Sequence, residues 1–216
     1  MIVNPVVESK THPSLTIDSI YLTNESTTCY LSVINQNTEG NAWFCADTNI
    51  DIVDIKSGIK RPLLSSLGIP VCPDAYRFKE FGEKLSFVLN FGPLHNTNAE
   101  IDIIENCSDN CFSLKGIVLD QKLNKEIRAF EKGLALYKEE KPEEALGVFE
   151  KIKRESDFKK ERHVAYCYYI LPLMYIDMEK YDLARKAYND LLESQIKDKN
   201  YFIQKLNGED FNWKKP

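Results

Sequence analysis

Two similar segments decide the fold of the C-terminal half of the chain. The first reads AFEKGLALY (129–137) and then PEEALGVF (142–149), and the second reads YYILPLMY (168–175) and then YDLARKAY (181–188). Apolar residues recur in both every three to four positions, which places them on one face of a helix. The pattern predicts four helices arranged as two helical hairpins.

Small residues stand where the two helices of each predicted hairpin would cross. Ala145 and Ala184 occupy equivalent positions, and an aromatic residue follows each of them four residues later. Gly133, which has no side chain, would let the partner helix approach closely. Pro172 lies inside a predicted helix, where it removes a backbone donor and is expected to kink the helix.

This pattern resembles the tetratricopeptide repeat, whose units combine a small residue, an aromatic four residues later and a turn over about 34 positions. The resemblance implies α-α superhelical hairpins that bind other polypeptides and rarely carry chemistry themselves. The step from Ala145 to Ala184 is longer than that period, and Pro142 replaces the usual aromatic of the turn. A generic four-helix unit is the alternative.

The resemblance also implies a binding face lined by the first helix of each hairpin. Arg128, Lys132, Tyr168 and Tyr175 are the candidate partner-binding residues on that face. In the alternative interpretation, both tyrosines pack in the core and the two charges are merely solvated.

Two repeats are fewer than the three usually needed for a free-standing stack, so the exposed ends require a cover. The tail at 198–216 is rich in apolar side chains, namely Tyr201, Phe202, Ile203, Leu206, Phe211 and Trp213. We expect the tail to dock on the last hairpin, and self-association through it is the alternative.

The N-terminal half has the period-two alternation of β-strands. Apolar and polar residues alternate in runs at 15–22, 29–34, 50–55, 85–91, 101–104 and 112–119, with turn residues between them. About seven short strands with frequent turns predict an antiparallel, immunoglobulin-like β-sandwich. A small barrel is the alternative.

Further stretches of this half lie at 4–8, 11–15, 82–84, 91–94, 101–105 and 116–117. In these stretches the half resembles a β-sandwich module of bacterial cell-envelope proteins. The resemblance implies an extracytoplasmic setting and no activity. The sequence therefore predicts a β-sandwich at 1–120, two helical hairpins at 121–197 and a C-terminal extension at 198–216.

Charge and hydropathy argue against nucleic-acid binding and against a segment that spans a membrane. The net charge of −5 gives no electrostatic footprint for nucleic acid. No apolar run approaches the ~18–20 residues that span a bilayer, so we expect no transmembrane segment. The N-terminus lacks the pattern of a signal peptide. Localisation stays open: periplasmic or cell-envelope if a leader was trimmed, otherwise cytoplasmic.

Six cysteines are too few for a disulfide scaffold in a chain of 216 residues. Cys107 and Cys111 are the only close pair, and both a disulfide and two free thiols fit their spacing. Without further Cys or His ligands nearby, they are a poor zinc signal. We therefore expect no metal and no cofactor, and we expect Cys167 to pack in the helical core.

Motifs for catalysis are missing from the sequence. His12, His95 and His163 do not neighbour a nucleophile motif, and no glycine-rich phosphate loop occurs. We therefore expect a non-enzymatic interaction or adaptor protein that binds a protein or peptide. One alternative is an accessory carbohydrate-binding or structural module of an envelope enzyme, with Trp43 and Phe44 as the local candidates, although we expect Trp43 in the core. A hydrolase with a dispersed site is the other.

Overall fold

A computed structural model describes residues 1–38, 42–94 and 100–208. The chain forms two compact units, Met1–Asn124 and Lys125–Pro216, and the boundary between them in the sequence falls within helix α1 (Gln121–Lys138). His95, Phe211 and Trp213 lie outside the described residues. Asp120 begins α1, because its Oδ1 accepts the backbone N–H groups of Lys122 and Leu123.

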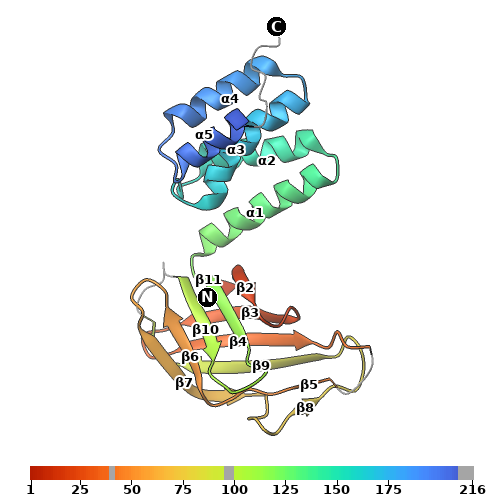
Figure 1. The fold of residues 1–216 in the computed structure, drawn as a ribbon. Coiled ribbons are helices and arrows are strands. Elements are labelled where there is room, and N and C mark those ends of the chain that lie inside the picture. Colours follow the sequence, from red (N-terminus) through yellow and green to blue (C-terminus); the bar gives the residue numbers. More distant parts are fainter. Residues whose placement is uncertain (39–41, 95–99, 209–216) are drawn as a thin grey trace. The chain divides into compact units, whose positions relative to one another are not determined.

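The N-terminal unit, called the β unit here, is built from antiparallel strand pairs (Figure 1). Its strands are β1 (Ile2–Val3), β2 (Val7–Lys10), β3 (Leu15–Leu22), β4 (Thr27–Ile34), β5 (Trp43–Phe44), β6 (Ile50–Asp54), β7 (Lys60–Leu67), β8 (Tyr76–Arg77), β9 (Lys84–Phe91), β10 (Glu100–Glu105) and β11 (Ser113–Val118).

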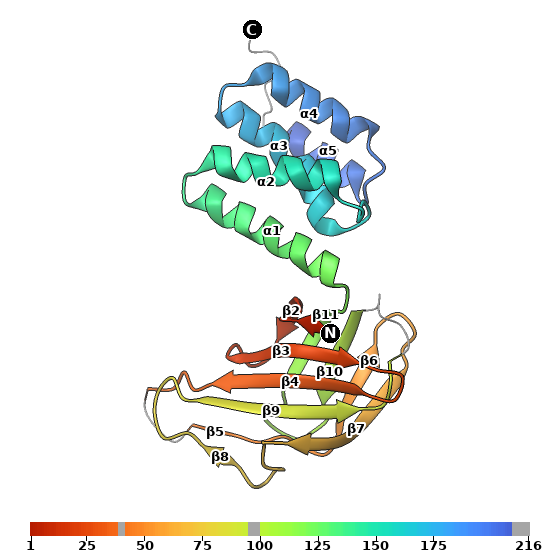
Figure 2. The ribbon, with the colours of Figure 1, turned by 180° about the vertical axis from the view of Figure 1, so that it is seen from behind.

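Nine of these strands form one sheet in the order β1-β3-β4-β9-β7-β6-β10-β11-β2, and β5 pairs with β8 separately. Strand β7 joins the two halves of this sheet, which are β1, β3, β4 and β9 on one side and β6, β10, β11 and β2 on the other. Its first residues pair with β6, and those from Leu63 pair with β9. The register shifts between Leu63 and Ser65. Figure 2 shows β10 and β11 behind β3, β4 and β9, so the sheet curls over into a half-barrel.

The inward-facing residues of both halves form one core. Alternate positions of β3 and β9 are buried, for example Leu15 and Ile17, and Leu89 and Phe91. This alternation matches the period-two pattern of the sequence. An antiparallel β unit followed by helices is thus confirmed, while the immunoglobulin-like arrangement stays a prediction.

Several strands escape the sequence analysis. Strand β7 contains Pro62 and is mostly exposed, so it shows neither a clean alternation nor a buried face. β5 and β8 are two residues long. The strand that joins the two halves of the sheet is therefore one that the sequence pattern does not predict.

In the described residues, four further helices follow α1, and together they form the helical unit from Lys125 onward. They are α2 (Pro142–Glu155), α3 (Arg162–Asp177), α4 (Tyr181–Glu193) and α5 (Lys199–Gly208). Helix α3 packs against α2, α4 and α5, and it buries residues on all its sides, as a central helix must. It continues past Pro172 as one helix.

The small residues lie at helix contacts. Ala145 and Ala184 are fully or almost fully buried. A Cβ atom at Gly133 would lie 2.8 Å from Cε1 of Phe149, so α1 and α2 approach closely there, as predicted. In the tail, α5 buries Phe202 and Leu206 in a cluster with residues of α3, so this part of the tail docks on the helices.

Candidate functional site

A groove of about 610 Å³ runs between α2, α3 and α4, and we call it the helical groove. All its lining belongs to the helical unit. The residues are Glu150, Lys153, Arg154, Tyr168, Leu171, Tyr175, Leu183, Lys186, Ala187, Asp190, Glu193 and Ser194. Three of these side chains are cationic and three are anionic, so the groove carries both signs of charge.

Tyr168 and Tyr175, two of the four predicted partner-binding residues, both line this groove. The Lys153 ammonium lies over the Tyr168 ring, 5.1 Å from its centroid, and forms an ion pair with Asp190. The Tyr175 hydroxyl donates to Glu150. One wall of the groove is therefore held by interactions between α2, α3 and α4.

The tyrosine hydroxyls stay protonated in this setting. Burial, followed by the neighbouring carboxylate of Asp190, raises the pKa of Tyr168. Burial and the hydrogen bond to Glu150 raise the pKa of Tyr175. Both hydroxyls are therefore uncharged at neutral pH.

Arg128 and Lys132, the other two predicted residues, lie on α1 and do not line the helical groove. The structure brings together the tyrosines of α3 but not the charges of α1. Sequence reasoning missed Lys153, Leu183 and Lys186. Leu183 is exposed and lies outside the buried stripe of α4. An apolar residue on the polar face of a helix was the sequence signal that could have indicated this part of the groove.

A buried polar cluster lies elsewhere in the helical unit. The Ser156 hydroxyl donates to Oε1 of Glu126, and Nε2 of His163 lies 2.6 Å from the same oxygen. Ser156 and His163 are both buried. A serine nucleophile needs a base on its own hydroxyl, whereas here the carboxylate separates serine and imidazole. The cluster instead ties α1 to the segment between α2 and α3.

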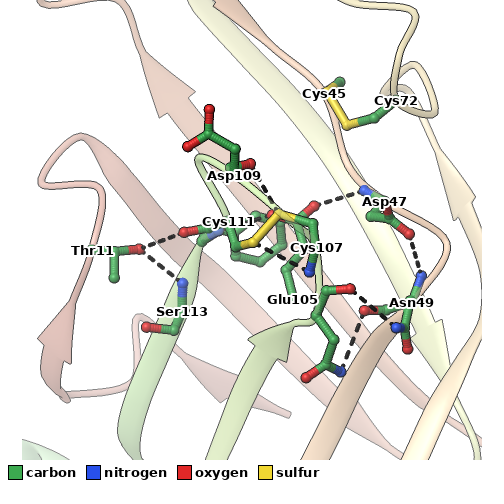
Figure 3. Close-up of a disulfide and its surroundings, with 12 residues drawn as sticks. Thr11, Cys45, Asp47, Asn49, Cys72, Glu105, Cys107, Asp109, Cys111 and Ser113 are labelled. Atoms are coloured by element: carbon green, nitrogen blue, oxygen red, sulfur yellow. Dashed lines mark hydrogen bonds between the residues drawn. A yellow bond between two sulfur atoms is a disulfide. The ribbon is translucent and has the colours of Figure 1, made fainter.

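The β unit has a smaller pocket of about 370 Å³ at the tip of the β10–β11 hairpin, and we call it the tip pocket. Its lining is His12, Trp43, Phe44, Cys45, Asp47, Cys72, Pro73, Glu105, Cys107, Ser108, Asp109, Asn110 and Phe112. Three of these residues are cysteines, and with Cys111, which is not part of the lining, they form two disulfides (Figure 3).

Cys107 and Cys111 are joined across the hairpin tip, with an S–S distance of 1.97 Å, and we call this bond the tip disulfide. Cys45 and Cys72 form the second bond, the strand disulfide. These two residues are 27 positions apart, and no local pattern in the sequence indicates that they pair. Cys29 and Cys167 are buried free thiols, and burial raises the pKa of each to about 12.

Glu105 lies beside the tip disulfide, and its carboxylate is buried. Its Oε1 accepts the backbone N–H of Asp47 at 2.6 Å, and its Oε2 accepts that of Phe112 at 2.8 Å. Glu105, Cys107 and Cys111 lie close together, but the two sulfurs are joined in a disulfide and are not thiolates. These three residues therefore do not offer the ligands that a zinc ion needs. Glu105 instead fixes two walls of the tip pocket to each other.

Trp43 contradicts the expectation that it packs in the core. The residue is 49% exposed, whereas Phe44 is 8% exposed. Successive residues of a strand face opposite sides, so Phe44 takes the inward side of β5 and Trp43 the outward side. Inside, the Phe44 ring lies 6.1 Å from that of Phe112 and 5.8 Å from that of His12.

Across the described parts of the chain, no helix has the length and apolar character needed to cross a membrane. Comparison of the chain with protein-family models, with curated proteins and with solved structures finds no match.

Proposed function

We propose that this chain is a non-enzymatic interaction protein whose helical unit binds a peptide segment in the helical groove. The observation that carries the proposal is the groove itself, which is about 610 Å³ in volume and lined by three helices. Its volume lies within the roughly 300–1,000 Å³ typical of ligand sites.

The lining fits a polypeptide better than a polyanion. The groove combines aromatic surface from the partly buried Tyr168 and apolar surface from Leu183 with lysines and carboxylates around them, whereas Tyr175 is only 6% exposed. A peptide offers apolar side chains, both signs of charge and backbone groups to such a surface. Because three cations and three carboxylates line the groove, it has no excess of positive charge to attract a polyanion.

Leu183 is the exposed apolar residue of the groove that a bound peptide would cover. It is 44% exposed on α4. Leu192 lies on the same helix at 42% exposure but does not line the groove. The two leucines therefore form a matched pair, in which one substitution lies inside the proposed site and the other outside it.

The test begins with selection of binding peptides from a random phage-displayed library against the full chain. Affinities of the selected peptides are then measured by fluorescence anisotropy. We expect Leu183→Glu to weaken binding about tenfold or more, because it places a charge in the apolar part of the groove, and Leu192→Glu to leave it unchanged. The double variant Arg128→Glu/Lys132→Glu tests the face of α1.

Three outcomes would count against the groove. Selection of no peptide by a folded chain is one, and equal losses for Leu183→Glu and Leu192→Glu are another. The third is loss of binding only in the α1 double variant, which would place the partner on the face of Arg128 and Lys132 instead.

We further propose that this protein acts in the cell envelope, and the two disulfides support that setting. Disulfides persist in oxidising compartments and are rare in the cytosol. Both bonds belong to the β unit, which is also the part that resembles an envelope module. Fractionation of the native cells, with this chain detected by antibody, tests the compartment, and recovery in the cytosolic fraction alone would oppose it.

A further inference from the structure

The tip pocket is held in shape by links that reach across it. The strand disulfide joins Cys45, directly after β5, to Cys72. The tip disulfide closes the β10–β11 hairpin. The buried carboxylate of Glu105 accepts the backbone N–H of Asp47 (Figure 3) and also that of Phe112, two residues of the pocket lining. A site fixed in this way loses little conformational entropy when a ligand binds.

One wall of the pocket is an indole that the core does not use. Trp43 is half-exposed and lines the pocket, while its neighbour Phe44 packs inward against Phe87 and Phe112. The face of an aromatic ring carries partial negative charge, so it attracts the partial positive charge of C–H groups stacked on it. Trp43 thus offers a flat surface for a ligand with an array of C–H bonds.

Part of the pocket lining is polar. Asp47, Ser108, Asp109 and Asn110 contribute short hydrogen-bonding side chains to it. Oδ1 of Asp47 accepts the backbone N–H of Asn49 at 2.8 Å, and Oδ2 of Asp47 has no hydrogen-bond partner among the described residues. The carboxylate and amide oxygens of these side chains can accept hydrogen bonds from several hydroxyl groups at once.

Charge limits the kind of ligand. Three carboxylates line the pocket and neither lysine nor arginine does, within the described lining. An anionic ligand would therefore be repelled. The volume of about 370 Å³ is near the lower end of the range for small-molecule sites.

We propose that the tip pocket binds a saccharide, with one uncharged sugar ring stacked on the indole of Trp43 and its hydroxyls bonded to Asp47. A sugar ring has the required combination, since its C–H bonds form an apolar face and its hydroxyls surround the edge. The β unit would then contribute a glycan contact that is independent of peptide binding by the helical groove.

The test uses the full chain with both disulfides intact, as verified by non-reducing mass spectrometry. The probes are cellotetraose, mannotetraose and chitotetraose, with tetragalacturonate as an anionic comparison. Saturation-transfer NMR detects binding, and calorimetry measures affinity. The chain has two tryptophans, so a Trp213→Phe background leaves Trp43 as the sole indole, whose fluorescence should change with saturable sugar binding.

The expected result is binding of at least one uncharged tetrasaccharide and no binding of tetragalacturonate. Trp43→Ala should weaken binding about tenfold or more, since an aromatic anchor is removed. Asp47→Asn should weaken it severalfold while keeping the turn, because the amide oxygen still accepts the Asn49 N–H. Phe81→Ala is the control, since Phe81 is 63% exposed and lies outside the pocket lining.

The proposal is overturned if none of the uncharged probes binds the folded, oxidised chain. It is also overturned if binding survives Trp43→Ala and Asp47→Asn unchanged, or if Phe81→Ala reduces it equally. Thermal unfolding of each variant separates loss of the site from loss of the fold.

Discussion

The close contact between α1 and α2 gives a stability prediction in which two glycines of one hairpin behave in opposite ways. A Cβ atom at Gly133 would lie 2.8 Å from Cε1 of Phe149 and 3.1 Å from Cγ1 of Val148. A Cβ atom at Gly147 would have no neighbour within 4 Å. Both glycines lie inside helices, so Gly→Ala removes the same conformational-entropy cost of ordering a glycine backbone at each position.

The magnitudes follow from two opposing contributions. Replacing glycine with alanine inside a helix gains about 0.8–1 kcal/mol of helix propensity. Overpacking a filled core costs about 1–3 kcal/mol. Phe149 is fully buried and its ring lies 5.6 Å from that of Phe130, so it has little room to retreat. We expect Gly147→Ala to be stabilising and Gly133→Ala to be neutral to destabilising, with a difference of about 1–3 kcal/mol.

The assay is urea denaturation of the full chain, followed by far-ultraviolet circular dichroism, to which the helices contribute most. The free energy of unfolding is obtained for wild type, Gly133→Ala and Gly147→Ala under identical conditions. Equal stabilisation by both substitutions would refute the reasoning, because it would mean that α1 and α2 are not in contact at Gly133.

Two further predictions concern pH and the disulfides. The Tyr137 hydroxyl donates to Asp177 at 2.7 Å, and burial, with this bond, raises the pKa of Tyr137 from 10.0 to about 12. The stabilisation is therefore complete below pH 10 and is lost as the pH rises through 12, so alkaline thermal scans should show a steep decline that is shallower in Tyr137→Phe. Replacing the strand disulfide with two serines should destabilise the β unit by about 3–4 kcal/mol, and the tip disulfide by about 2 kcal/mol, since the first closes the longer loop. Denaturant titration monitored by Trp43 fluorescence in the Trp213→Phe background measures both, and the reverse order would contradict the loop argument.

Local patterns predicted much of the secondary structure. The run at 15–22 became β3 with the predicted bounds, and the stripes around Ala145 and Ala184 became α2 and α4. These elements are read correctly because their periodicity is a local property of the chain. Gly133 was also predicted correctly, since a residue without a side chain in a helical stripe indicates a close helix contact.

Elements that depend on distant partners were missed. Strand β7, with Pro62 and little burial, is ordered by pairing with β6 and β9 and not by its own pattern. The strand disulfide joins residues 27 positions apart, and no local signal distinguishes that pairing from others among six cysteines. Trp43 was expected in the core because large aromatics usually lie there, and only its outward side on β5 shows otherwise.

The candidate sites divide in the same way. Tyr168 and Tyr175 were proposed as partner-binding residues from the resemblance to helical repeats; both line the helical groove, and Tyr175 is also buried in the core, as the alternative interpretation expected. The charges around them and the whole tip pocket come from segments far apart in the chain. Helical and strand periodicity, order of the two units and net charge were thus determined by the sequence alone. Tertiary structure alone decided which residues come together to line the helical groove and the tip pocket. Contacts between distant segments depend on how the chain packs, and they leave no periodic trace in the sequence.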